Sequence, residues 1–188
     1  MEKLSRLNLS LALVHYPVAN KKGEEICSAV TNLDLHDIAR AARTYGVNAY
    51  YVVTPLEDQK ILVERISSHW TTGNGGKVNP ARAEALRLIN VKHALEDVVL
   101  DIRQKGNGVP KVVVTTAKKN SRMIRYEAFR EIMKNGEPYL LAFGTAWGLS
   151  EEIIKTADYV LEPLDGNTGY NHLSVRSAVS IILDRLAR

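Results

Sequence analysis

The sequence predicts an α/β fold in which a parallel sheet is covered by helices on both faces. Short β-rich runs alternate with helical segments along nearly the whole chain. Several of these runs are continuously apolar or β-branched, as expected for strands buried on both faces of a sheet. Such alternation favours parallel strands joined by crossover helices. A chain of 188 residues has the usual size of one domain, so we expect a single domain over residues 1–188.

The expected strands are short and are separated by helices or turns. Each is rich in Val, Ile, Leu or aromatic residues, which fit a pleated and buried surface. In chain order they are Leu9–Tyr16, Ala49–Thr54, Leu86–Val91, Lys111–Thr115, Tyr139–Phe143 and Tyr159–Leu161.

The expected helices carry apolar residues at helical spacing. In Asp34–Tyr45 the apolar residues fall on one face, Asn32 is a candidate N-cap, and Gly46 is a candidate stop. The stretch Thr71–Pro80 contains three glycines and is expected to be a long surface loop. The other expected helices are Asp58–Ser68, Leu95–Lys105, Ser121–Lys134, Ser150–Thr156 and, to the end, about Leu173–Leu186.

Composition and charge indicate a globular protein with a mild preference for polyanions. The formal net charge is +4, which suggests an anionic partner but does not identify one. Cys27 is the one cysteine, so an intrachain disulfide and a cysteine metal cluster are excluded, as is typical of a reducing compartment. The apolar run Leu9–Val14 is too short for a signal peptide or a membrane span. We therefore expect a cytoplasmic protein.

Familiar catalytic motifs do not fit. Gly-Asn-Gly-Gly-Lys at 73–77 is followed by Val78, whereas a Walker loop requires Ser or Thr there and a dinucleotide fingerprint requires glycine. No histidine is paired with a second histidine or with a cysteine at metal-ligand spacing, and no Gly-x-Ser-x-Gly elbow occurs. These absences disfavour a metalloenzyme or a serine hydrolase.

Three strand-to-helix turns are candidates for the walls of one pocket. Gly144 and Gly148 bracket a turn after the strand that ends at Phe143, and Asp165–Tyr170 forms a loop before the last helix. Thr115–Ala117 follows a third strand. Ligands bind at the carboxyl ends of strands in open α/β sheets, and glycine allows the backbone to approach them. Spacing alone leaves open that these are ordinary turns.

Two of these turns resemble motifs of the SPOUT (SpoU–TrmD) superfamily of S-adenosylmethionine (SAM)-dependent RNA methyltransferases. Phe-Gly-Thr-Ala-Trp-Gly-Leu-Ser at 143–150 is similar to its second motif, Phe-Gly-x-Glu-x-x-Gly-Leu. Glu162-Pro163-Leu164 and the later Tyr-Asn-His-Leu-Ser-Val at 170–175 are similar to its third, and 32–46 to its first. The sequences at 29–40 and 170–177 most resemble small single-domain bacterial members. One departure is that Thr145 or Ala146 stands where the second motif has Glu.

The resemblance implies a parallel-sheet α/β/α fold with a deep C-terminal trefoil knot at about residues 111–188. It further implies a homodimer whose active site forms where the two knots meet, with no membrane association, and a SAM pocket built by the knot loops. The implied cofactor-binding residues are Thr115, Thr116, Ala117, Phe143, Gly144, Thr145, Trp147, Gly148, Leu161, Glu162, Pro163, Leu164, Tyr170, Asn171, His172, Leu173 and Ser174.

Catalytic candidates lie on two helices. His36, Arg40 and Arg43 are spaced to share one face of the first helix. They form either a solvated basic stripe or a site that grips phosphate and activates the acceptor. The first motif carries a catalytic arginine, for which Arg43 is the first choice and Arg40 the second. At the start of the last helix, Asn171 and His172 are candidates for acceptor activation, with His172 as the base.

The substrate implied by the resemblance is tRNA or rRNA, and the methylated atom is a base atom or the 2′-hydroxyl. Trp147 could stack on a base or on the cofactor adenine, or belong to the core. An inactive SPOUT-type RNA-binding protein is the main alternative, because the motif-two acid is missing. A second alternative is an α/β protein whose pocket binds a nucleotide other than SAM. Basic residues available to RNA are Lys118, Lys119, Arg122, Arg125, Lys21, Lys22 and Lys77.

Overall fold

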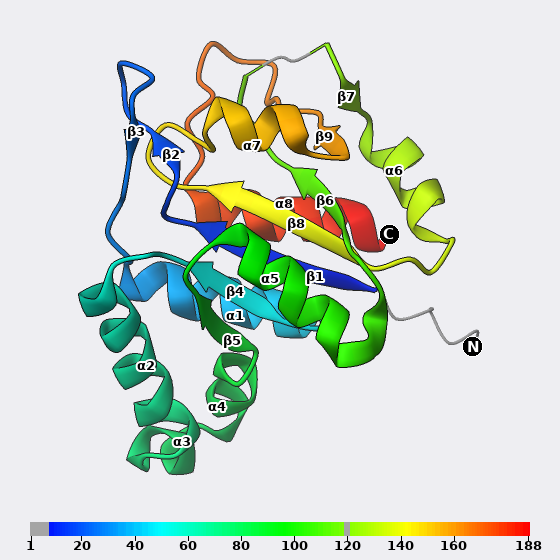
Figure 1. The fold of residues 1–188 in the computed structure, drawn as a ribbon. Coiled ribbons are helices and arrows are strands. Elements are labelled where there is room, and N and C mark those ends of the chain that lie inside the picture. The colour runs from blue at the N-terminus through cyan, green and yellow to red at the C-terminus, as the bar shows by residue number, and fades with distance from the viewer. Residues whose placement is uncertain (1–7, 119–120) are drawn as a thin grey trace.

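A computed structural model describes residues 8–118 and 121–188 of the chain. It contains one main sheet in the strand order β5-β4-β1-β8-β6-β9-β7, and every neighbouring pair is parallel (Figure 1). The expectation of a parallel α/β sheet is therefore confirmed. In that order the strands are Ile89–Lys92, Tyr50–Val53, Leu9–Val14, Tyr139–Gly144, Lys111–Val114, Tyr159–Leu161 and Met123–Ile124.

Helices cover both faces of the sheet. Leu9, Leu11 and Leu13 of β1 point into one core, with residues of α1 and α8, whereas Ala12 and Val14 point into the other, with α5. This division follows from the alternation of side chains along a strand. The helices are α1 Asn32–Thr44, α2 Glu57–Thr71, α3 Asn74–Val78, α4 Pro80–Leu86, α5 Leu95–Ile102, α6 Tyr126–Met133, α7 Glu151–Thr156 and α8 Val175–Ala187.

Helix α1 begins and ends where local chemistry allows it. The N-cap is Thr31 rather than the predicted Asn32, because the Thr31 hydroxyl accepts a hydrogen bond from the backbone N–H of Asp34 at 3.3 Å. Gly46 stops the helix as predicted, in a left-handed conformation with φ of +71°. Within α1 the apolar face, including Leu35 and Ile38, is fully buried against the sheet.

The prediction of a loop over Thr71–Pro80 is wrong in part, because this segment contains the short helix α3 and the start of α4. The Asn79 side chain accepts a hydrogen bond from the backbone N–H of Arg82 at 3.0 Å, and Pro80 occupies the first turn of α4. Helix α4 runs to Leu86, so β5 begins at Ile89 rather than at Leu86. Helices α2, α3 and α4 form a lobe that projects beyond the β5 edge of the sheet (Figure 1).

Two further predicted helices are shorter than expected. Residues 121–125 were predicted as the start of a helix, but Met123–Ile124 pairs with Val160–Leu161 of β9 as strand β7, and α6 starts at Tyr126. Helix α5 ends at Ile102, where a wider turn, Arg103–Asn107, follows with Gly106 at φ of +83°. The hairpin of β2 (Val18–Ala19) and β3 (Glu25–Ile26) was not predicted.

Candidate functional site

A cavity of about 830 Å³ lies at the carboxyl ends of β1, β6, β8 and β9. This is the edge at which parallel α/β sheets bind ligands, and the volume falls in the range of small-molecule sites. The three predicted turns all contribute walls: 115–118 after β6, 143–148 at the end of β8, and 162–174 after β9. The sequence-based expectation that they share one pocket is therefore met by the fold.

The turn after β8 is compact because Gly144 has no side chain. A Cβ atom at Gly144 would overlap the backbone of Gly148 and Leu149. Gly148 has φ of +105°, which other residues rarely adopt, and its backbone N–H donates to the Thr145 carbonyl at 2.9 Å. Strand β2 fixes the turn from outside, since the Trp147 N–H donates to the Ala19 carbonyl at 3.1 Å.

The loop 162–174 is joined to the turn after β6. The Asn171 side-chain amide donates to the Ala117 carbonyl at 3.1 Å. At its end, the Ser174 hydroxyl accepts from the backbone N–H of Ser177 at 3.3 Å and caps α8. At its start, the Tyr126 hydroxyl donates to the Glu162 carbonyl at 2.8 Å, and the residues between these anchors are mostly exposed.

A fourth wall, residues 28–34, was missed as a pocket segment in the sequence analysis. Ser28, Ala29, Thr31 and Asp34 line the cavity between β3 and the start of α1. The Ser28 hydroxyl lies 2.5 Å from the Thr145 hydroxyl and 3.0 Å from Nδ1 of His15. The sequence did mark residues 29–40 as motif-like. It gave no indication that this segment contacts Thr145 of the second motif and Arg176 beside the third.

His15 is a buried neutral histidine behind this wall. It is completely buried, and burial lowers its pKa to about 4, against the opposing influence of the Asp34 carboxylate and the Ser28 backbone. It is therefore uncharged at neutral pH and can hold the Ser28 hydroxyl in place through Nδ1.

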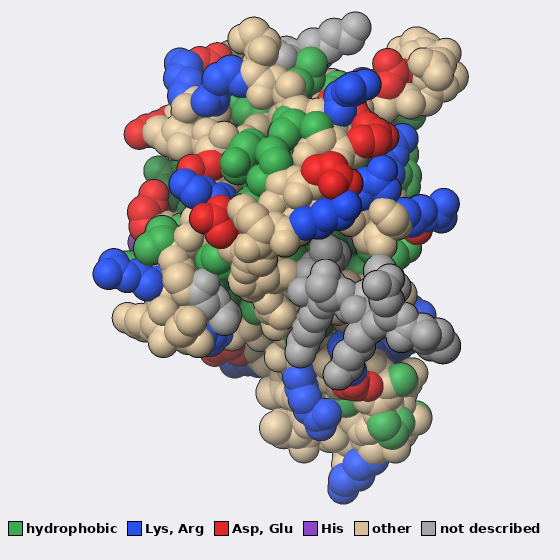
Figure 2. Space-filling model, turned by 90° about the vertical axis from the view of Figure 1, so that its right-hand side faces the viewer, with side chains coloured by type: hydrophobic (Ala, Val, Ile, Leu, Met, Phe, Trp, Pro, Cys, Tyr) green, Lys and Arg blue, Asp and Glu red, His purple; other side chains and the backbone are tan. Residues whose placement is uncertain are grey.

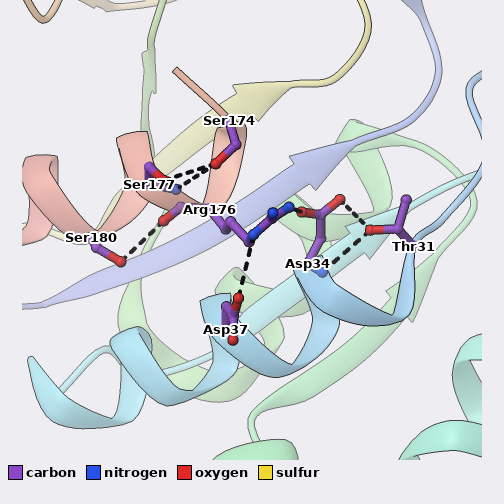
Figure 3. A network of polar contacts seen from close by, with 7 residues as sticks. All are labelled: Thr31, Asp34, Asp37, Ser174, Arg176, Ser177 and Ser180. Carbon is purple, nitrogen blue, oxygen red and sulfur yellow. Dashed lines mark hydrogen bonds and ion pairs between the residues drawn. The ribbon is translucent and has the colours of Figure 1, made fainter.

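Arg176 joins the last helix to the first at the edge of the cavity (Figure 3). Its guanidinium lies 3.4 Å from an oxygen of Asp34 and 3.4 Å from an oxygen of Asp37. Asp34 is held in turn by the Thr31 hydroxyl, which donates to it at 2.7 Å. This network fixes two cavity walls relative to each other, although the residues come from opposite ends of the chain.

Nearly all the cofactor-binding residues expected from sequence line the cavity, including Asn171 and His172. The exceptions are Leu161, which is buried in the sheet, Pro163, and Tyr170, whose side chain is 71% exposed. Trp147 is 57% exposed at the rim and is not a core residue. Additional lining residues that were not among the expected cofactor-binding residues are Lys118, Tyr126, Ala146, Val175, Arg176, Ala178 and Ile182.

The basic residues of α1 do not line this cavity. His36 and Arg40 face a separate groove of about 520 Å³ between α1 and the α2–α4 lobe. Arg43 forms an ion pair with Glu84 of α4. Within one chain, therefore, the fold does not bring these candidates together with Asn171 and His172.

The other basic candidates have different environments. Lys118 lines the cavity, whereas the Arg122 guanidinium donates to the backbone carbonyls of Ile154 and Ala157. Arg125 is exposed before α6, and Lys21, Lys22 and Lys77 are also exposed. Lys119 lies outside the described residues. On the face shown in Figure 2, Lys and Arg side chains are interspersed with Asp and Glu rather than gathered into one patch.

The cavity is suited to a ligand with both apolar and polar parts. Apolar groups of Phe143, Leu164 and Leu173 lie beside the backbone of two turns, and Glu162 and Asp34 supply carboxylates. Among the described residues, no group of His, Cys, Asp and Glu side chains could hold a metal ion. In the same part of the chain, none of the helices is long and apolar enough to cross a membrane.

Comparison with known proteins connects this geometry to a family. A family model described as "SAM-dependent RNA methyltransferase" matches residues 8–188. An uncharacterized protein of Aquifex aeolicus is 42% identical over 180 residues, covering 95% of this chain and 88% of that protein. A "tRNA (guanine-N(1)-)-methyltransferase" of Nitratidesulfovibrio vulgaris is 45% identical over 179 residues, which cover 95% of this chain but 42% of the relative.

Solved structures resemble the fold at low sequence identity. The A. aeolicus TrmH/SpoU tRNA modifying enzyme superposes with a TM-score of 0.57 at 19% identity, covering 96% of this chain and 74% of that one. At this identity the likeness concerns the fold alone.

Proposed function

The chain belongs to the SAM-dependent RNA methyltransferase family, and from that premise we propose that it methylates a nucleotide of tRNA or rRNA with SAM as donor. The observation that carries the proposal is the cavity at the strand ends, where the turns that resemble the superfamily motifs converge. The match covers less than half of the N. vulgaris relative, so the guanine N1 position in that protein's name is not carried over. The acceptor is a base atom or a 2′-hydroxyl.

The walls of the cavity fit the chemistry of SAM. The turns 115–117 and 143–148 present backbone groups at the strand ends, which can recognise the adenine edge and the amino-acid part. The exposed ring of Trp147 is placed to stack on a planar group. The Glu162 carboxylate gives the cavity a negative group that suits a sulfonium cation, whereas the Asp34 carboxylate is paired with Arg176. We propose that the other cofactor-binding residues implied by the resemblance contact SAM through apolar side chains or through backbone groups where they line the cavity.

When bound, SAM supplies a methyl group that is transferred in line to a nucleophilic atom of the RNA. The contribution of the protein is mainly alignment of the two reactants. A hydroxyl or ring N–H acceptor also loses a proton, and we propose that His172, with Asn171 beside it, takes up that proton at the cavity mouth. A cationic side chain near the acceptor would stabilise the charge that develops there.

We propose Arg40, rather than Arg43, as that cationic side chain. The ion pair with Glu84 neutralises Arg43, whereas Arg40 has no ion pair among the residues that the structure describes. Arg40 lies on the exposed side of α1, outside its own cavity. A second copy of the chain could present it to the neighbouring cavity.

A homodimer of this kind is part of the proposal, as is membership of the SPOUT superfamily with its trefoil knot in residues 111–188. Large apolar side chains exposed near the cavity mouth support an interface there: Trp147, Tyr170 and Leu173. The hydrogen bond from the Asn171 side chain to the Ala117 carbonyl joins the C-terminal loop to the turn after β6, within the segment proposed to form the knot. We further propose one domain and a cytoplasmic location, in keeping with an RNA substrate.

An RNA-binding protein without methyltransferase activity is the second candidate. It is favoured by the second motif, where Thr145 or Ala146 stands in the position of a glutamate. The Thr145 hydroxyl is occupied by Ser28 and by the Val14 carbonyl, so no carboxylate takes that place.

The two candidates are separated by incubating the protein with SAM labelled in the methyl group and with unmodified tRNA or rRNA. Label in the RNA is expected, and mass spectrometry of the nucleosides then identifies the acceptor. SAM binding without transfer to either RNA would instead support the inactive candidate. Absence of SAM binding by folded protein would overturn the cofactor proposal.

A further inference from the structure

A second concave surface lies beside the cofactor cavity, on the other side of α1. It is the groove of about 520 Å³ between α1 and the α2–α4 lobe. The side chains that determine its chemistry are His36 and Arg40 from α1, Arg65, His69 and Trp70 from α2, and Arg82 from α4. The proposed cofactor cavity is lined by no residue of the α2–α4 lobe, so it does not account for these side chains.

The groove has an excess of positive charge. Arg40, Arg65 and Arg82 have no ion-pair partner within residues 8–118 and 121–188, although many other cations of the chain do. Asp37 is the acidic residue that lines the groove, and its carboxylate is engaged by Arg176 at 3.4 Å. Three arginines therefore face a shared space without an acidic partner, and this excess of positive charge attracts anions.

Trp70 orients one of these arginines. The Arg82 guanidinium lies over the indole ring, 4.7 Å from its centroid. The rings of His36 and His69 meet the same indole edge-on, at 5.4 Å and 5.2 Å. This contact restrains the Arg82 side chain before a ligand binds, so less conformational entropy is lost on binding.

The groove also contains polar atoms that lack partners. Nε of Arg82 and Nδ1 of His36 are buried and make no hydrogen bond within the described part of the chain. Buried donors without partners are uncommon and cost free energy. The pKa of His36 is lowered, first by burial and then by Arg82, although Asp37 opposes this. The imidazole is therefore neutral near pH 7, and the arginines carry the charge of the groove.

The groove and the cofactor cavity share one helix. Thr31 and Asp34 of α1 line the cavity, whereas His36, Asp37 and Arg40 line the groove. Arg176 lines the cavity and bonds to Asp37, so the two surfaces meet at that ion pair. An RNA strand that passes over the first turns of α1 would contact both the groove and the cofactor cavity.

We propose that this groove binds the RNA backbone, with Arg65 and Arg82 contacting a phosphate that flanks the nucleotide held at the cofactor cavity. The proposal rests on the proposed function, because it assumes that RNA is the substrate. Arginine recognises phosphate through paired N–H donors, as the stacked guanidinium of Arg82 can provide. The α2–α4 lobe thus supplies RNA affinity that the catalytic core alone lacks.

The test compares the full chain with Arg65→Gln, Arg82→Gln and the double variant. The matched control is Arg103→Gln, which changes an exposed arginine in the turn after α5, on the other side of the sheet. Binding of fluorescein-labelled, unmodified tRNA is followed by anisotropy at several salt concentrations. SAM binding is measured by calorimetry, and thermal melting checks that each variant is folded.

Each groove variant is expected to bind tRNA about tenfold more weakly, as for a lost charged hydrogen bond. The slope of log Kd against log salt should fall by about 0.7–0.9 for each phosphate contact removed. Arg65→Lys should restore much of the slope, because a point charge remains, and Arg103→Gln should change neither quantity. SAM affinity should be unaffected in all variants.

Unchanged tRNA affinity and salt slope in the folded double variant would overturn the groove proposal while leaving the proposed function intact. A change of oligomeric state in that variant, seen by light scattering, would also overturn it, because Arg65 and Arg82 would then hold the dimer together rather than bind RNA. If the wild-type chain did not bind SAM, that result would count against the proposed function. Failure of the groove proposal and failure of the proposed function are therefore distinguishable.

Discussion

The guanidinium of Arg176 lies 3.4 Å from the carboxylate of Asp34, across a separation of 142 residues in the sequence. The contact joins α8 to α1, and both residues line the proposed cofactor cavity. The Asp34 side chain is 9% exposed, and its carboxylate contacts Arg176 and the Thr31 hydroxyl in place of water.

Arg176→Gln is expected to lower the free energy of unfolding by about 1–2 kcal/mol, because it leaves a nearly buried carboxylate without its cation. Asp37→Asn, which removes the more exposed partner of Arg176, should cost about 0.5 kcal/mol or less. Urea unfolding of both variants measures the difference. Equal costs would show that Asp34 does not depend on the ion pair.

Gly144→Ala is expected to abolish SAM binding in calorimetric titration, because the new Cβ would overlap the backbone of Gly148 and Leu149 and open the turn. Overpacking of this kind also costs about 1–3 kcal/mol of stability. Gly166→Ala is the matched control, since a Cβ there meets no atom within 4 Å. Wild-type SAM affinity in folded Gly144→Ala would remove the turn from the cofactor site.

Arg40→Ala is expected to lower kcat/KM for methyl transfer about 100-fold, as for the loss of a charge that stabilises a transition state. SAM affinity should not change, because Arg40 lies outside the cavity of its own chain. Arg43→Ala, which breaks the ion pair with Glu84, should stay within about threefold of wild-type activity. The reverse order would return the catalytic role to Arg43, the first choice from sequence.

Protein stability is expected to fall between pH 6.5 and about 4 because of His15. In the unfolded chain His15 binds a proton below its ordinary pKa of 6.5, whereas in the folded chain its pKa is lowered to about 4. The unfolded state therefore binds more protons in this window, and acid favours unfolding by up to about 3 kcal/mol. His15→Asn should reduce this pH dependence, measured as urea unfolding at pH 7, 5.5 and 4.5. An identical pH profile in the variant would contradict the assignment.

Trp147 is expected to report SAM binding by a change in its fluorescence, because its exposed ring lies at the rim of the cavity. Trp147→Phe should eliminate the signal and weaken binding about two- to tenfold, the range of a lost aromatic stacking contact. Trp70→Phe, in the separate groove, should keep both the signal and the affinity. A signal that persists in Trp147→Phe would place the ligand elsewhere.

Most of the fold was predictable because it depends on local pattern. The buried strand β1 and the amphipathic helix α1 follow from apolar runs and helical spacing. The elements that were missed are those made by distant partners. Strand β7 exists because Met123 and Ile124 pair with β9, and its residues taken alone suit the helix that was predicted.

The sequence by itself determined the alternating α/β order, the turns that follow the strands, and, through its motifs, the family. Only the tertiary structure decided which of those residues meet. In the fold, Ser28 contacts Thr145 and Arg176 contacts Asp34. Arg43 pairs with Glu84, and Arg40 lines a separate groove together with Arg82. These relationships arise from packing between segments far apart in the chain, and spacing along a sequence carries no information about such distances.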